Sequence, residues 1–457
     1  MECTNASTQK TKTMTTGARI ALSAVAGLVG SAVVTTTAHA AGFEKSIVWG
    51  GRSAGVAGIA TPYMQGADAL YFNPAGLAAD KAGHTLSFNI SPTSSQFKGP
   101  INNQNTEETS KSGLLTPLGL TYGFTPSESS WGFGLGAYVS GGSNAHFENV
   151  KFFGGESDKT EVKTDLQIME IAAGAAYRVS DDLKIGLAWR VVMAQANFAF
   201  ASRSALLPPF PGGTVTIANA KLSGLKDTEA AAFRFGAQYK VSESTELGLT
   251  FRSEVNLEAT GKADLKVFNP MTGAVLPTAS ATDKDATART TFPMAVTLGA
   301  LHKLNEDWNL LGEYVWTQYS RVGEINVESD AFASTGGKTS LKTEWADQHN
   351  VRVAAEYLSP WPVRFGYIWT NTVTKEDHAR ASFTPPGPAH TVTLGTGKAF
   401  EFGEQNLRFD AAFEYTTTSG DVGNGAAAGG NAVGGDTRNG KYSVNAYVAH
   451  LGLTYSF

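Results

Sequence analysis

The chain has 457 residues, of which 50 are glycine and only 17% are Asp, Glu, Lys or Arg. Soluble domains carry about a quarter charged residues, so this composition argues against an ordinary set of soluble domains. The net charge of −5 gives no reason to expect nucleic-acid binding. The single cysteine, Cys3, lies at the extreme N-terminus, which excludes a disulfide framework and a cysteine metal site in the rest of the chain.

The first forty residues have the three parts of a secretory signal. A basic start contains Lys10, Lys12 and Arg19. An apolar run extends from Ile20 to Val34, and Ala38-His39-Ala40 provides an A-x-A cleavage site. A transmembrane anchor is the alternative, but the apolar run is too short and the cleavage site follows it directly. We therefore expect residues 1–40 to be a cleaved signal peptide.

A small segment from residue 41 to 83 precedes the first strand-like stretch. It is rich in glycine and alanine and carries scattered apolar anchors such as Phe43 and Phe72. A segment of this size, placed before a closed sheet, can fold back into the interior of the sheet and plug it. We therefore expect residues 41–83 to form a hatch and residues 84–457 to form the sheet.

From His84 onward, apolar and polar residues alternate with the period of a β-strand. In the stretch 184–192, for example, Leu187 and Trp189 share one face and Arg190 lies on the other. This is the lipid-outside, lumen-inside pattern of a transmembrane barrel. A soluble β-sandwich would also alternate, but with shorter strands. The chain ends on Phe457, like the terminal strand through which the assembly machinery of bacterial outer membranes recognises barrels.

Short polar turns alternate strictly with long connections that are polar or rich in glycine and proline. The short turns lie at residues 127–130, 180–182, 242–244, 305–307, 359–361 and 403–405. The long connections lie at residues 99–112, 148–163, 202–222, 261–288, 329–348, 375–388 and 419–439. Outer-membrane barrels have tight periplasmic turns, long external loops and an even number of strands, here about 14. The sequence thus predicts an all-β fold, a 14-stranded antiparallel transmembrane β-barrel with a small N-terminal plug inside.

Two of the expected external loops contain apolar residues. The first loop carries Leu206, Leu207, Pro208 and Phe210, and the next loop carries Phe268. An exposed apolar cluster indicates an external landing site for a hydrophobic ligand. The alternative is that these loops pack against their neighbours.

Charged residues occur on the face of the strands that is expected to point into the lumen. They include Glu170, Arg190, Arg234, Arg252, Arg352, Glu356 and Arg364. The preferred interpretation is a paired ladder that makes the lumen rigid, because unpaired charges in a partly dry interior are costly. The other interpretation is that one of the arginines binds a ligand carboxylate.

Several short motifs, taken in order, make the sequence resemble the FadL family of outer-membrane transporters for long-chain fatty acids, which includes toluene- and xylene-uptake channels. They are Ala41-Gly42-Phe43 at the mature start, Asn73-Pro74-Ala75, Thr291-Phe292-Pro293, and Arg364-Phe365-Gly366-Tyr367 with the proline-rich loop 385–388 and the strand 391–395 that follow. The resemblance covers the whole mature chain.

This resemblance implies a plugged barrel in the outer membrane of a Gram-negative bacterium. The hatch would include Phe43, Asn73, Pro74 and Ala75. A hydrophobic ligand, foremost a long-chain fatty acid, would pass from an external apolar site to a buried pocket without an energy source, helped by movement of the hatch. The family also has a kinked third strand that opens the wall sideways, and Gly141 and Gly142 are the candidate kink here. Their alternative is a strand end before a loop.

The remaining expectations concern partners and alternatives. The resemblance implies a monomer that contacts outer-membrane lipid and lipopolysaccharide. The histidines are scattered and no H-E-x-x-H motif occurs, so we expect no metal, no cofactor and no enzyme activity. An aromatic-hydrocarbon channel is the main alternative function. An outer-membrane lipase would need a Ser/His pair at the lipid boundary, which the sequence does not reveal, and an adhesin would not need the plug.

Overall fold

The computed structural model describes residues 50–101, 107–111, 113–150, 160–205, 215–269, 272–358, 361–403, 405–423 and 439–457. They all belong to one compact unit, Val34–Phe457. The expected signal peptide, Phe43 and the loop residues 206–210 lie outside the described residues, so these predictions stay predictions. No helix in the described part of the chain combines the length and apolar character needed to cross a membrane.

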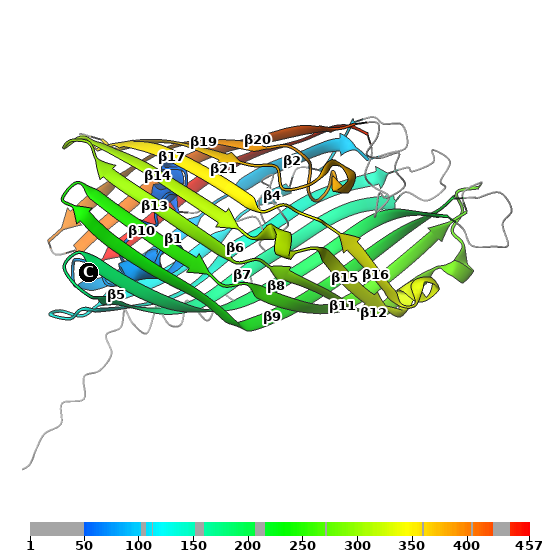
Figure 1. Ribbon diagram of the computed structural model, residues 1–457, viewed down its shortest axis with the longest axis horizontal. Coiled ribbons are helices and arrows are strands. Elements are labelled where there is room, and N and C mark those ends of the chain that lie inside the picture. Colours follow the sequence, from blue (N-terminus) through cyan, green and yellow to red (C-terminus); the bar gives the residue numbers. More distant parts are fainter. Residues whose placement is uncertain are drawn as a thin grey trace, which may run out of the picture. The chain divides into compact units, whose positions relative to one another are not determined.

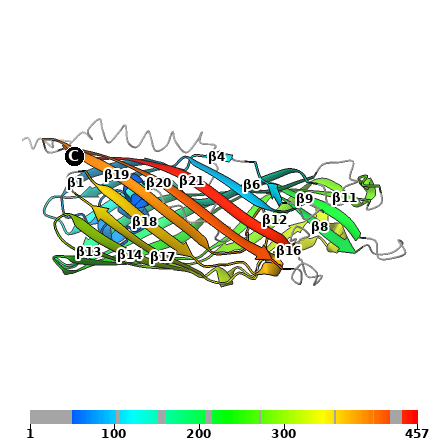
Figure 2. The same cartoon turned by 90° about the horizontal axis from the view of Figure 1, so that it is seen from above.

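All strands belong to one antiparallel sheet, and they run obliquely to the long axis of the barrel (Figures 1 and 2). The strands are β1 (Gly83–Ile90), β2 (Thr93–Pro100), β3 (Glu107–Thr109), β4 (Gly113–Leu115), β5 (Leu118–Thr125), β6 (Trp131–Val150), β7 (Thr160–Arg178), β8 (Leu183–Ala205), β9 (Val215–Ser242), β10 (Thr245–Arg252), β11 (Val255–Phe268), β12 (Ala281–Phe292), β13 (Ala295–Lys303), β14 (Trp308–Thr317), β15 (Glu324–Ser329), β16 (Lys338–Lys342), β17 (Gln348–Tyr357), β18 (Val363–Thr370), β19 (Ala389–Phe402), β20 (Gln405–Val422) and β21 (Gly440–Ser456).

The sheet closes because β1 pairs with β21, for example through Phe88 and Leu453. Several strands continue one another after a short interruption, as β1 continues into β2 and β10 into β11, and together they form 14 barrel strands. The predicted fold class is confirmed. Closure pairs the backbone groups of the wall, as strands in a lipid environment require.

The two faces of the wall follow the predicted alternation. On β8, Leu187 and Trp189 are 52% and 45% exposed, whereas Ala188 and Arg190 between them are 0% and 2% exposed. The outer face carries leucine, valine and aromatic residues along most strands. This apolar outer face is the lipid-facing surface of a transmembrane barrel.

Several stretches expected to be external loops are strands instead. Most of the stretch 261–288 belongs to β11 and β12, and the connection between these two strands is only 269–280. The prediction of a long loop here is wrong because the alternation continues past the membrane with polar outward residues. The two strands stay paired there, from Val255 with Phe292 to Leu265 with Ala281.

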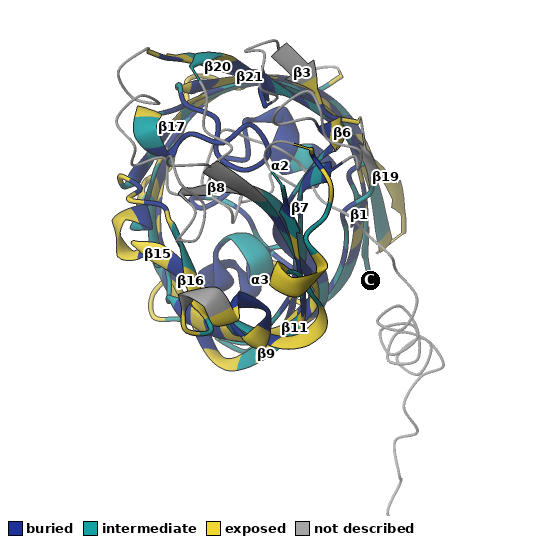
Figure 3. Cartoon of the chain, turned by 90° about the vertical axis from the view of Figure 1, so that its right-hand side faces the viewer, coloured by how far each residue is buried: buried dark blue, intermediate teal, exposed yellow. Residues whose placement is uncertain are grey.

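An inner segment, defined here as residues 50–82, lies inside the ring of strands (Figure 3). It contains two short helices, α2 (Gly51–Gly55) and α3 (Ala69–Phe72), and the 3-10 turn η1 (Pro74–Leu77). Further 3-10 turns lie in the connections: η2 (Pro277–Ala279), η3 (Tyr319–Arg321), η4 (Asp330–Thr335) and η5 (Glu376–His378). The inner segment occupies the end of the barrel that has the short turns, since Pro74 of η1 lies against Gly186, close to the start of β8.

Candidate functional site in the barrel interior

The inner segment meets the wall at glycines that face inward. A Cβ on Gly186 of β8 would lie 2.4 Å from the carbonyl carbon of Pro74, and one on Gly366 of β18 would lie 2.6 Å from the Ala57 nitrogen. No side chain fits at such a distance, so glycine lets the backbone of the segment touch the backbone of the wall. The wall is therefore shaped for this segment.

Asn73, one of the expected hatch residues, is fully buried and joins the segment to the wall. Its Nδ2 donates to the carbonyl oxygens of Thr61 (2.7 Å) and Ala237 (2.9 Å), and its Oδ1 accepts from Ala75 N (3.2 Å). The Ala75 contact also caps η1, which begins at Pro74. Asn73 thus ends α3, begins η1 and binds β9 at the same time.

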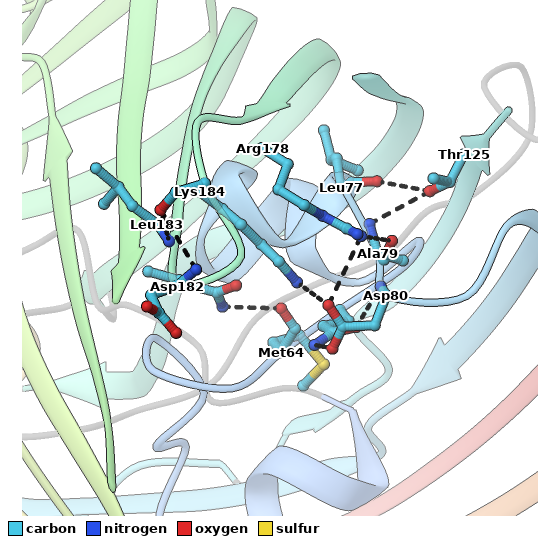
Figure 4. A network of polar contacts seen from close by, with 12 residues as sticks. Met64, Leu77, Ala79, Asp80, Thr125, Arg178, Asp182, Leu183 and Lys184 are labelled. Carbon is cyan, nitrogen blue, oxygen red and sulfur yellow. Dashed lines mark hydrogen bonds and ion pairs between the residues drawn. The ribbon is translucent and has the colours of Figure 1, made fainter. Parts of the chain in front are cut away.

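A second polar contact holds the end of the inner segment at the turn between β7 and β8 (Figure 4). Lys184 Nζ donates to Asp80 Oδ1 at 2.5 Å, and Gln65 Nε2 donates to Asp80 Oδ2 at 2.6 Å. Arg178 Nη2 donates to the carbonyl oxygen of Ala79 at 2.6 Å. Burial raises the pKa of Asp80, but the hydrogen bonds from Lys184 and Gln65 outweigh it and hold this pKa below its ordinary value.

Next to the inner segment, two guanidinium groups share one buried carboxylate. Arg190 Nη2 and Nε donate to Glu170 at 2.6 and 2.8 Å, and Arg234 Nη2 lies 3.6 Å from the same group. Arg234 Nη1 also donates to Leu70 O and to the hydroxyl of Tyr138, both at 3.3 Å. We call Glu170, Arg190, Arg234 and Tyr138 the cationic layer.

The other expected lumen charges have other partners. Arg364 donates to Glu356 at 2.7 Å and to Asp410 at 2.9 Å. Arg352 donates to Glu313 at 3.0 Å, and that carboxylate also accepts from backbone N–H groups of the inner segment. The structure therefore places Arg352 and Arg364 in ion pairs that link β14 with β17, β17 with β18, and β18 with β20. Arg252 is half-buried and donates to Pro293 O at 3.3 Å.

Apolar side chains fill the interior toward the long connections. A first apolar cluster is lined mainly by β7, β8, β9, β11 and β12, and includes Leu166, Ile168, Val192, Leu225, Leu257, Tyr319, Trp345 and Phe383. A second apolar cluster lies against β2, β6, β20 and β21, and includes Phe97, Phe147, Phe268, Tyr442 and Val444. The two clusters make this part of the interior apolar, and an apolar lining with a few polar groups is what a site for hydrophobic ligands requires.

Phe268 therefore does not lie on the surface, as the sequence suggested. It is 1% exposed and belongs to the second apolar cluster. Phe268 is the last residue of β11 and pairs with Ile217. By the alternation of β11 it lies on the face opposite to Ala263 and Leu265, and this face packs against the second apolar cluster whereas those two residues belong to the first. The expectation of an exposed landing residue at Phe268 is wrong.

The connection between β18 and β19, expected to be an external loop, is buried from His378 to Pro386. Ala379 and Ala381 join the second apolar cluster and Phe383 joins the first. Arg380 stands between them and is 2% exposed. This buried cation could not be predicted from the sequence, because the proline-rich stretch around it is typical of a surface loop.

Strand β6 is irregular where the kink was expected. Its pairing with β7 shifts register between Val139 and Gly141, and the residues from Tyr138 to Ser143 are all buried instead of alternating. Within the described residues, β6 pairs with β5 only from Phe133 to Tyr138. We call the interruption above Tyr138 the β5–β6 break. Bulges of this kind bend a strand and end its pairing.

The chain is similar to known outer-membrane proteins in both sequence and structure. The model of the family described as outer membrane protein transport protein (OMPP1/FadL/TodX) matches residues 31–457. A putative outer membrane protein of Neisseria meningitidis serogroup B is 22% identical, over 94% of this chain and 97% of that protein. The long-chain fatty acid transport protein of Salmonella typhi is 22% identical, over 59% of this chain and 63% of that protein.

Solved structures show the same fold. A Pseudomonas aeruginosa FadL homologue has a TM-score of 0.70 at 17% identity, covering 91% of this chain and all of that one. The toluene transporter TodX of Pseudomonas putida has a TM-score of 0.68 at 18% identity, covering 90% of this chain and 98% of that one. These likenesses support the fold, and they do not identify the ligand of this chain.

Proposed function

Because the chain belongs to the OMPP1/FadL/TodX family of outer-membrane transport proteins for hydrophobic compounds, we propose that its ligand is a long-chain fatty acid. The observation that carries this proposal is an apolar interior that ends on buried cations. A fatty acid presents a long apolar tail and one carboxylate, so it needs both kinds of surface in one pocket.

The apolar part would hold the tail and the cationic layer would bind the carboxylate. Arg234 has two neutral hydrogen-bond partners, Leu70 O and Tyr138, and shares Glu170 with Arg190. A guanidinium group binds a carboxylate through parallel hydrogen bonds. Arg380 offers a second buried cation between the two apolar clusters, on the path from the long connections to the cationic layer.

The proposed route begins at the external loops, including the apolar residues 206–210. It passes the apolar clusters and leaves sideways at the β5–β6 break, where β6 bends beside Tyr138. The inner segment is the hatch that blocks the other end, and its movement would accompany passage. We further propose that the protein is a monomer, contacts lipopolysaccharide and uses Phe457 in assembly.

An aromatic-hydrocarbon channel is the second candidate, and the aromatic lining of the first apolar cluster favours it. The ring of Phe383 lies 6.1 Å from that of Phe198 and 5.7 Å from that of Trp345. Tyr319 meets Trp345 edge to face at 5.6 Å. Such rings would pack against toluene or xylene without a charged partner. Buried arginines have no role for these ligands, which is why we prefer the fatty acid.

Binding of labelled oleate and labelled toluene to the purified full chain separates the two candidates. We expect oleate to bind, and Arg234→Gln and Arg380→Gln to weaken it at least about tenfold, because a charge-assisted hydrogen bond contributes about 1.5–3 kcal/mol. Arg289→Gln, a change in an exposed arginine of β12, is the matched control and should have no effect. Binding of toluene alone, unaffected by all three changes, would instead establish the hydrocarbon channel.

A further inference from the structure

A chain of hydrogen bonds joins a serine, a histidine and a glutamate inside the wall, where the first and last strands meet. Ser91 Oγ lies 2.9 Å from His450 Nδ1, and His450 Nε2 lies 3.3 Å from Glu414 Oε2. Each of the three residues is 1% exposed. The ring is therefore held at both nitrogens. This Ser/His pair faces the interior, away from the lipid boundary where a lipase would need it.

The position of Ser91 connects this chain of hydrogen bonds to the β5–β6 break. Ser91 follows β1 directly, and its N–H donates to Pro117 O at 2.8 Å. The neighbouring pair is Ile90 with Leu118, and the next residue, Gly119, pairs with Tyr138 of β6. Tyr138 is the last β6 residue before the break. Ser91 thus stands one strand away from the proposed exit.

A carboxylate faces an energetic barrier at such an exit. Carboxyl groups have an ordinary pKa of about 4.3 and are ionised at neutral pH. Transfer of an isolated carboxylate into hydrocarbon costs far more than transfer of the neutral acid. A fatty acid that leaves sideways into lipid therefore passes more easily after it has gained a proton.

On the basis of the proposed function, we propose that Ser91, His450 and Glu414 form a proton-donating site for the carboxylate of the ligand beside the β5–β6 break. The imidazolium of His450 gives its Nδ1 proton to Ser91 Oγ, and the hydroxyl proton of Ser91 passes to the carboxylate oxygen. The products are a neutral acid, an intact serine and a neutral imidazole, which regains a proton from water. Glu414 Oε2 accepts a hydrogen bond from Nε2 of the same ring and holds its orientation.

The surroundings fit this role. Strand β21 packs against β20 and α2, among other elements. In the described part of these elements, charged groups that face the interior near His450 are Glu414, Asp410 and Arg408 of β20 and Arg52 of α2. Two residues further along β21, Gly452 lines a small polar pocket together with Asn89 and Thr454. Its charged lining residues are Asp68, Asp410, Arg408 and Arg52. The pocket provides a polar space for water close to the histidine.

The test compares two ligands of equal chain length in cells that lack their own transporter. Oleate needs a proton to enter lipid, whereas oleyl alcohol is neutral. We expect His450→Gln to lower the initial rate of oleate uptake at least about tenfold, in the range of a lost general acid, and to leave oleyl alcohol uptake unchanged. His349→Gln, on the outer face of β17 and bonded to Tyr314, is the matched control and should change neither rate.

Unchanged alcohol uptake also shows that the His450→Gln barrel is folded and inserted. Equal losses for both ligands would mean that His450 only supports the wall, and no loss for either ligand would mean that it transfers no proton. Both results overturn the inference while the proposed function stands. If the unaltered chain takes up the alcohol but no oleate, the proposed function itself fails.

Discussion

The half of the interior next to the short turns and the half next to the long connections stabilise the same wall by different means. Near the short turns, the inner segment touches wall glycines backbone to backbone, and buried ion pairs such as Arg364 with Glu356 join adjacent strands. Near the long connections, apolar side chains and the inward connection 371–388 fill the space. Directional contacts fix one geometry, whereas apolar packing accepts ligands of different shape. A rigid half and an adaptable half suit the selective passage that we propose.

The largest effect should come from the buried charges in the half next to the short turns, which we call the lower half. Arg364 is fully buried and pairs with both Glu356 and Asp410. Arg364→Ala leaves two carboxylates without this partner, and we expect a loss of about 3–5 kcal/mol in the free energy of unfolding. Denaturant unfolding of the barrel in lipid vesicles measures it. Arg289→Ala, which breaks two exposed ion pairs, should lower this free energy far less, because exposed ion pairs contribute little. Equal costs would show that the lower half has no special rigidity.

A side chain at a wall glycine should separate the inner segment from the wall. In Gly186→Val the new Cβ would lie 2.4 Å from the Pro74 carbonyl carbon, so the segment or the strand must shift. We expect a loss of about 1–3 kcal/mol, typical of overpacking, and faster proteolysis within residues 50–82. Gly312→Val is the control, because the nearest atom to its Cβ would be 4.0 Å away. If Gly186→Val and Gly312→Val behave alike, the segment does not rest on β8.

The contacts of Asn73 should contribute a similar or smaller amount. Asn73→Ala removes two donated hydrogen bonds to the carbonyl oxygens of Thr61 and Ala237 in a fully buried place. We expect a loss of about 1–3 kcal/mol, measured by the same unfolding experiment. Asn305→Ala, in the exposed turn between β13 and β14, is the control, because it removes only an exposed hydrogen bond from Asp307 N. A stable Asn73→Ala protein would show that the other contacts of the segment hold it without Asn73.

The smallest effect should come from Asp80, whose side chain is 64% exposed. Its pKa is lower in the folded chain than its ordinary value of 3.8. The contact therefore stabilises the fold above about pH 4 and is lost as the pH falls through the folded pKa. Asp80→Asn should cost at most about 1 kcal/mol at pH 7, and the gap to the unaltered chain should shrink toward pH 3. A gap that grows on acidification would contradict this account.

The sequence predicts the wall far better than it predicts the interior. Period-2 alternation places Leu187 outside and Arg190 inside, because each residue reports its own face. It cannot show that Arg380 folds inward, since a proline-rich connection has no period. Nor can it show that Ser91 and His450 meet, because these residues are 359 positions apart and come together only when β1 closes on β21. Local pattern determines a strand, and closure determines its partners.

Uptake by whole cells tests the central claim most directly. Cells that lack their own transporter would receive the full chain, and labelled oleate, toluene and a small sugar would be offered separately. The account predicts uptake of oleate that depends on the chain and is much faster than uptake of the sugar. The reason is that the inner segment, as the proposed hatch, would block the passage of small polar solutes through the lower half. Free passage of the sugar without uptake of oleate would contradict it, and the protein would then be an open, water-filled pore.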